Sequence, residues 1–394
     1  MKRAASFFDR VEVFGLVVLL ASLPLSEALK SAGIALAVLG YLGKSASGVR
    51  PSVGARAPAW ALLAFVGAAA LSVVAARPEL RQPGELFTLG MTVAPFFLVA
   101  DACSRPGRRR VLAFAIVAGC AFAAIDGYVT YMTGDAHRLA LGSVENPVPA
   151  AEYLGATLAL ATALLIAEVG APLAGPLTGF ACGATAIALI LTRSRGPLFG
   201  AAAGVVMVLG AGLRRRAYAL LLLLAVVISA TWFALANPES RMSGGAALDS
   251  SSASFRLVTW RAATELIAER PMLGHGLGTF AEMGVIYQDE ASRAAVENAH
   301  NTWMHAGSET GILGAGALTA FLVLGMLAIA RSLRCEDRMG RAVSVGALGA
   351  VASLAIAGLF SVTTDAEPGM LLFALMALGQ LAPAAGLPRA VGGA

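Results

Sequence analysis

The chain has 394 residues, of which 58% are hydrophobic and only 13% are charged, and its mean hydropathy is +0.75. Soluble domains carry about 25% charged residues, so this composition excludes an ordinary soluble protein and predicts an all-α polytopic membrane protein. The formal net charge of +5 is explained by basic connectors between membrane spans, and it gives no reason to expect a nucleic-acid partner.

Twelve apolar stretches are long enough, or nearly long enough, to cross a bilayer as helices of about 20 residues. In chain order they cover residues 7–26, 27–43, 58–76, 86–102, 111–133, 150–168, 171–192, 196–212, 217–235, 311–330, 342–362 and 367–384. We therefore expect nine transmembrane helices in residues 1–235, a loop with two short amphipathic helices in residues 236–310, and three transmembrane helices in residues 311–394. No convincing cleavage site follows the apolar run 11–23, so we expect a retained first span.

The distribution of basic residues predicts the orientation. When the N-terminus is placed in the cytoplasm, more than half of the 29 Lys and Arg residues fall in short connectors on that side. Both termini are then expected to be cytoplasmic, and the 236–310 loop to be periplasmic. None of the cysteines lies in that loop, which disfavours a disulfide framework; they are Cys103, Cys120, Cys182 and Cys335.

Arginines stand out in the short outer connectors, where basic residues are disfavoured. Arg193 and Arg195 lie together in the sequence LTRSRGPLFG, whereas Arg138, in the outer loop 134–149, could line a polar cavity or cap a helix end. Snorkelling at the membrane interface is the alternative explanation. Because a guanidinium is permanently charged and can donate two parallel hydrogen bonds to a phosphate, this clustering indicates an anion site.

The long loop predicts an amphipathic helix that carries another arginine. Residues 237–253 are rich in Gly and Ser and are expected to be mobile, Ser254 is expected to cap the helix, and the GHGLG run at 274–278 is expected to form a flexible turn. Arg256 would then lie in the first helical turn, where free N–H groups favour a phosphate. Pairing of Arg256 with a loop carboxylate stays open as the alternative. Trp260, four residues later, could stack on the guanidinium or on a sugar.

Residues 300–314, HNTWMHAGSETGILG, join the long loop to the next span. His300 and Asn301 are expected near the start of a second loop helix, whose positive end would keep the His300 imidazole neutral and available as a base. A capping or packing role is the alternative. His305 and Glu309 are spaced i,i+4 on one face, whereas His300 and His305 are not, so a zinc site is not expected.

Taken together, these residues resemble the O-antigen ligase family, a branch of the group that also contains O-antigen polymerases and O-linked protein oligosaccharyltransferases. The likeness covers the topology of the whole chain and is sharpest at three motifs. These are SRG at 194–196, the stretch FRLVTWRAATELIAERPMLGHGLGTF at 255–280, and His300-Asn301 followed after nine residues by Gly311 and then Gly314. The third motif is the most specific to ligases.

The resemblance implies an inverting, metal-independent glycosyltransferase of the GT-C type that needs no cofactor. Its donor would be an O-antigen polysaccharide on undecaprenyl pyrophosphate, and its acceptor a sugar hydroxyl of lipid A-core at the periplasmic face of the inner membrane. His300 would act as the general base, while Arg195 and Arg256 would hold the pyrophosphate. Residues of second rank for substrate binding are Arg193, Arg138, Trp260, His305, Glu309 and Asn301.

The sequence leaves three alternative functions open. An O-antigen or exopolysaccharide polymerase would use the same donor, and the His300-Asn301 motif argues against it. A protein oligosaccharyltransferase is disfavoured because the chain ends soon after its last span. A twelve-span transporter is disfavoured because no internal repeat is visible and the middle of each span is read as free of charge.

Overall fold

The structure is a computed structural model that describes residues 2–105, 107–134, 137–212, 245–284, 298–334 and 337–380. The predicted span 217–235, residues 237–244 of the Gly/Ser-rich stretch and Cys335 lie outside these ranges. The described residues form helices joined by turns, with one isolated bridge between Leu141 and Val144.

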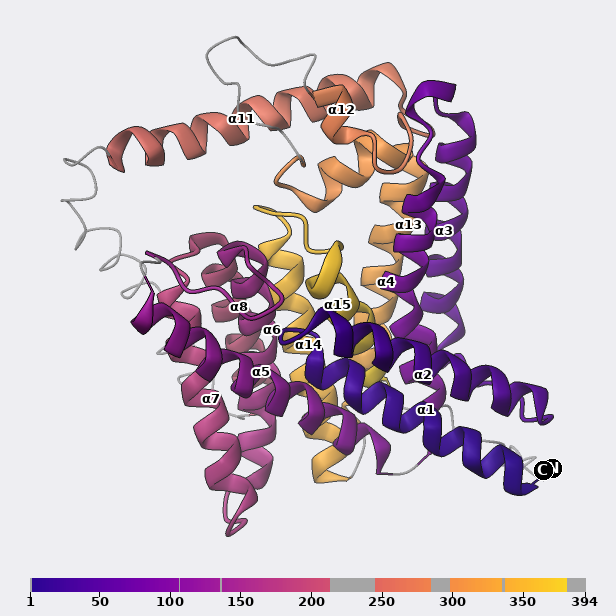
Figure 1. Cartoon of the computed structure of the whole chain (residues 1–394), viewed down its shortest axis with the longest axis vertical. Helices are drawn as coiled ribbons and strands as arrows, with labels where there is room; N and C mark the ends of the chain where they lie inside the picture. The colour runs from indigo at the N-terminus through magenta and orange to yellow at the C-terminus, as the bar shows by residue number, and fades with distance from the viewer. Residues whose placement is uncertain are drawn as a thin grey trace, which may run out of the picture.

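Figure 1 shows how the helices are arranged. Their bounds are α1 (Lys2–Ser22), α2 (Glu27–Ala46), α3 (Arg56–Ala75), the 3-10 turn η1 (Pro78–Leu80), α4 (Pro83–Ala102), α5 (Arg108–Thr133), α6 (Pro147–Glu168), α7 (Ala174–Leu191), α8 (Arg195–Gly212), α11 (Gly245–Glu269), α12 (Phe280–Gly284), α13 (Thr302–Ser332), α14 (Arg338–Ala357) and α15 (Ala366–Leu378).

Seven of these helices are long and apolar enough to cross a membrane, namely α3, α4, α5, α6, α7, α13 and α14. Helices α8 and α15 are also apolar but shorter. The described residues are those of a multi-pass membrane protein, and the total of twelve spans stays a prediction. Charged side chains are buried in helices α1, α2 and α6, namely Glu12, Lys44 and Glu152, although none lies at the middle of a predicted span.

Small residues let helices α8 and α14 pack with their backbones in contact. A Cβ atom added to Gly204 would lie 2.5 Å from the carbonyl oxygen of Gly349, and one added to Gly200 would meet the carbonyl oxygen of Ser353. Glycine at these positions is therefore a steric requirement of the close approach. The packing holds the start of α8 beside the end of α14.

Helix α11 lies across one end of the helical bundle, as Figure 1 shows. It packs on α13 through Ala263 and Leu266, which are buried with Phe280 and Ala299 in a small hydrophobic cluster. The predicted cap at Ser254 is wrong, since α11 begins at Gly245. The helix extends through the Ser- and Ala-rich residues 245–253, part of the stretch predicted to be mobile, because alanine favours helix.

Candidate active site

The turn between α7 and α8, residues 192–195, is here called the arginine turn. Its Ser194 hydroxyl accepts a hydrogen bond from Arg138 Nη2 at 2.7 Å and lies 3.2 Å from the carbonyl oxygen of Pro147, to which it donates. Arg138 Nε also donates to the carbonyl oxygen of Thr192 at 2.8 Å. These bonds fasten the 137–146 loop and the start of α6 to the arginine turn, while the side chains of Arg193 and Arg195 stay exposed.

Arginine side chains at this place are close enough to influence one another electrostatically. Burial lowers the pKa of Arg256 below its ordinary value, and the positive charge of Arg195 lowers it further. Burial and the charge of Arg193 act in the same direction on the pKa of Arg138. Within the described part of the chain Arg256 has no carboxylate partner, so the alternative of an ion pair with the loop finds no support. Like charges held together form a site that an anion would stabilise.

The position of Arg256 on its helix differs from the expectation. Because α11 starts at Gly245, Arg256 lies in the interior of the helix, away from the unpaired N–H groups of the first turn. The prediction that free N–H groups of the first helical turn favour a phosphate beside Arg256 is therefore wrong. The positive potential around Arg256 comes from Arg195, which belongs to a different helix.

His300 comes directly before the cap of α13 and has an unusual backbone. Its φ is 48°, and Arg193, with φ 53°, is the other non-glycine residue with positive φ among the described residues. The His300 N–H donates to Asn298 Oδ1 at 2.9 Å. Strained backbone of this kind is found mostly at functional sites, where the surrounding structure imposes it.

Asn301 caps α13, as its side-chain oxygen accepts from the N–H groups of Trp303 and Met304 at 3.0 and 3.1 Å. Its amide Nδ2 donates to the carbonyl oxygen of Leu359 at 3.2 Å. The Asn of the motif therefore both starts α13 and ties it to a second segment.

That segment, residues 358–365, is here called the α14–α15 connector. Its Gly358 carbonyl accepts from the N–H of Thr302 at 2.8 Å, and its Ser361 carbonyl accepts from the Thr302 hydroxyl at 3.1 Å. On its other side Phe360 lies against the arginine turn, since a Cβ atom on Gly196 would come within 2.9 Å of Phe360 Cβ. One connector thus contacts both the start of α8 and the start of α13.

Thr259, one turn after Arg256 on α11, links this helix to the residues just before His300. The Thr259 hydroxyl lies 2.9 Å from the carbonyl oxygen of Arg256 and 3.4 Å from that of Ala299, the residue before His300. With Arg195 close enough to Arg256 to lower its pKa, the structure brings Arg195, Arg256 and His300 to one end of the bundle.

The glycine-rich turn after α11 is held in place by α13, contrary to the expectation of a flexible turn. The N–H groups of His275 and Gly276 donate to the carbonyl oxygens of Ser308 and Glu309 at 3.0 and 2.9 Å. α13 changes direction at Gly311, with φ 65° and ψ −170°, and a side chain there would run into the backbone of Met272. The motif glycine therefore allows the turn to dock on α13.

His305 lies one turn into α13, between two carboxyl groups. Its Nε2 is 3.6 Å from Glu309 Oε1 and 4.0 Å from Asp365 Oδ2, and its ring contacts Phe280 with centroids 5.4 Å apart. Glu309 is only 4% exposed, and it also accepts from the Phe280 N–H at 3.1 Å. The His305 Nδ1 and Trp260 Nε1 atoms are buried without a hydrogen-bond partner among the described residues, so each has capacity for a ligand.

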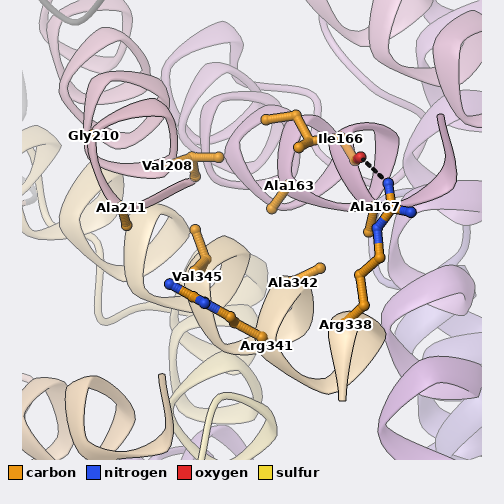
Figure 2. Close-up of a pocket in the computed structure, with 10 residues that line it drawn as sticks. All are labelled: Ala163, Ile166, Ala167, Val208, Gly210, Ala211, Arg338, Arg341, Ala342 and Val345. Atoms are coloured by element: carbon orange, nitrogen blue, oxygen red, sulfur yellow. Dashed lines mark hydrogen bonds between the residues drawn. The ribbon is translucent and has the colours of Figure 1, made fainter. Parts of the chain in front are cut away.

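A cavity of about 500 Å³ lies at the other ends of α6 and α14. Figure 2 shows it between the apolar side chains of these helices and α8, with Arg338 donating to the carbonyl oxygen of Ile166 at 3.1 Å. It is lined by residues 163–167 of α6, while the arginine turn contacts Pro147 at the start of that helix. The cavity is therefore separate from the candidate site.

Comparison with known proteins finds similarity to O-antigen ligases. A family profile described as O-Antigen ligase matches residues 180–319, which include the arginine turn, α11 and the start of α13. Residues 180–319 are similar to the O-antigen ligase family. Over 302 aligned residues the chain is 28% identical to an O-antigen ligase of Pseudomonas aeruginosa strain PAO1, covering 75% of this chain and 69% of that protein. Both findings support the O-antigen ligase family, and with it a ligase or glycosyl-transfer function at a membrane.

Some hydroxyl groups that join the segments of the candidate site have no role predicted from the sequence. The Ser194 hydroxyl, within the SRG motif, contacts Arg138, and the Thr302 hydroxyl contacts the α14–α15 connector. Ser361 and Glu152 lie outside every motif. A buried carboxylate in a span is a signal that could have been used, because charge at that depth is costly and usually functional.

Proposed function

We propose that this chain is an O-antigen ligase. It would transfer a polysaccharide from undecaprenyl pyrophosphate to a sugar hydroxyl of lipid A-core, on the periplasmic side of the bacterial inner membrane. A lipid pyrophosphate is already an activated leaving group, so the proposed reaction needs no nucleotide.

In the proposed reaction the acceptor oxygen attacks the anomeric carbon of the donor sugar from the side opposite the pyrophosphate. A carbon–oxygen bond forms there as the bond to the pyrophosphate oxygen breaks, which inverts the anomeric centre. The hydroxyl proton passes to the neutral imidazole of His300, and such general-base help contributes roughly 10²–10⁴-fold to a rate. Undecaprenyl pyrophosphate leaves with the electron pair.

Arg195 and Arg256 would bind the pyrophosphate and balance its growing charge in the transition state. Arg193 and Arg138 would extend the positive field, while Trp260 and His305 would offer their unpartnered N–H groups or ring nitrogens to sugar hydroxyls. Among the described residues, no cluster of His, Cys, Asp and Glu has the arrangement of a metal site. The metal-independent mechanism remains part of the proposal.

One observation carries this proposal: the positive charge of Arg195, from α8, acts on Arg256, and the helix turn of Arg256 is tied through Thr259 to Ala299, the residue before His300. A pyrophosphate ester has the charge to relieve that repulsion, and its anomeric carbon would be next to the base. The match of residues 180–319 to the ligase family supports the same reading.

Complementation of a strain that lacks its own O-antigen ligase tests the function. The chain should restore long-chain lipopolysaccharide and remove the accumulated lipid-linked polymer. In a strain lacking the polymerase, a ligase should change nothing, and the core should keep its single repeat unit. Recovery of chain length in the polymerase-deficient strain, with none in the ligase-deficient strain, would contradict the proposal and favour a polymerase.

Orientation is tested by labelling in a cysteine-free background. A membrane-impermeant thiol reagent applied to spheroplasts should label Glu145→Cys, in the exposed loop beside the arginine turn. It should not label Arg331→Cys, at the far end of α13. Both native side chains are exposed, so the reversed pattern would place the site on the cytoplasmic face.

A further inference from the structure

Glu152 is a buried carboxylate in the second turn of α6 that the proposed reaction does not use. Its side chain is 2% exposed, and one carboxyl oxygen accepts a hydrogen bond from the Ser361 hydroxyl. The other oxygen, Oε2, has no hydrogen-bond partner in the part of the chain that the structure describes. Burying an ionisable group in a membrane span is costly, so a compensating role is expected.

The partner of Glu152 is placed between the two halves of the candidate site. Ser361 belongs to the α14–α15 connector, and its carbonyl oxygen holds the Thr302 hydroxyl next to His300-Asn301. The neighbouring residue Phe360 packs on Gly196 in the first turn of α8. A shift of Ser361 would therefore change the distance between Arg195 and His300.

We propose that Glu152 is a positioning residue for the transfer reaction. Through Ser361 its carboxyl group fixes the α14–α15 connector, and so sets the distance between Arg195 and His300. This inference rests on the proposed function, since the spacing matters only if both residues act on one substrate. A misplacement of about 1 Å between reacting groups can cost on the order of 10²-fold in rate.

Removing the carboxyl group should loosen the connector without unfolding it. The Ser361 hydroxyl also lies 3.0 Å from the carbonyl oxygen of Ala357, so it keeps an acceptor when Glu152 is absent. The connector also keeps the backbone bond from the Thr302 N–H to Gly358. A variant at Glu152 is therefore expected to accumulate normally and to differ in catalysis.

The test measures kcat and the donor KM of purified Glu152→Ala and Glu152→Gln with lipid-linked polysaccharide and lipid A-core. Glu152→Ala should lower kcat roughly tenfold to hundredfold with little change in the donor KM, because the reacting groups are misplaced while the groups that bind the donor remain. Glu152→Gln should recover most of the rate, since its amide oxygen can still accept from Ser361. The matched control is Thr157→Ala, which removes another buried, polar side chain of α6 whose hydroxyl has no hydrogen-bond partner among the described residues.

A double-mutant cycle with Ser361→Ala separates positioning from general damage. If Glu152 acts through Ser361, the double variant should be no slower than the worse single variant. Additive losses, an unchanged rate in Glu152→Ala, a rise in donor KM alone, or a Gln variant as slow as the Ala variant would each overturn the inference. Failure of the unmodified protein to transfer any polysaccharide would instead overturn the proposed function.

Discussion

Charged residues cluster at both ends of α5, with opposite charges paired at one end and like charges gathered at the other. At its start, three carboxylates meet three cations: Lys44 contacts Glu12 and Asp101, and Arg105 and Arg108 contact Asp9. After its end, Arg138, Arg193, Arg195 and Arg256 gather as like charges. The first cluster, here called the ion-pair cluster, neutralises itself and serves the fold. The second brings like charges together, and in the proposed function it binds the pyrophosphate of the donor.

The sharpest test of this contrast is His300→Ala, at the site end. It should lower the transfer rate by roughly 10²–10⁴-fold, because the acceptor hydroxyl loses its base, while the level of protein in the membrane holds. The measurement is transfer by equal amounts of purified protein. His137→Ala is the control, since His137 is an exposed histidine of the neighbouring loop. Normal transfer by the His300 variant would remove this residue from the mechanism.

Lys44→Met breaks the ion-pair cluster at the opposite end. It leaves Glu12 and Asp101 buried without their shared cation, which costs about 3–5 kcal/mol when one partner of a buried pair is removed. Thermal unfolding in detergent should show the loss, and the protein that remains folded should keep its donor KM. Arg10→Met, an exposed change on the same helix as Glu12, should leave stability unchanged. A raised donor KM in folded Lys44→Met would mean that the two clusters are not separate in function.

Arg256→Lys keeps the positive charge at this position but removes the capacity of a guanidinium for bidentate hydrogen bonding. Losing one charge-assisted hydrogen bond, worth about 1.5–3 kcal/mol, should reduce kcat/KM for the lipid pyrophosphate roughly tenfold to hundredfold. Arg261→Lys is the matched control on α11, because Arg261 is exposed and pairs with Glu265. Full activity of Arg256→Lys would reduce Arg256 to a point charge.

Gly311→Ala tests the bend in α13, the helix that begins just after His300. The new methyl group would meet the Met272 backbone, and a positive φ is strained for alanine by about 1–3 kcal/mol. Lower thermal stability and a modest loss of transfer are expected. Gly316→Ala, on the same helix with open space around it, should change neither. Equal behaviour of the two variants would show that the bend is not needed.

Local patterns predicted much of this architecture. The apolar runs mark α3 to α7, α13 and α14, because burial in lipid needs long uninterrupted hydrophobic helices. The motif residues Asn301 and Gly311 mark the cap and the bend of α13. The start of α11 was misplaced, since a Ser- and Ala-rich stretch gives no strong signal for either helix or turn.

What composition and motif spacing determined by themselves is a multi-pass helical protein with arginines and a histidine in its polar loops. Only the tertiary structure decided that these residues share one place. The contacts responsible join distant positions, such as Asn301 with Leu359 and Glu152 with Ser361, which are 209 residues apart in the second case. Hydrophobic periodicity reports which face of a helix is buried, but it carries no information about which helix lies against that face.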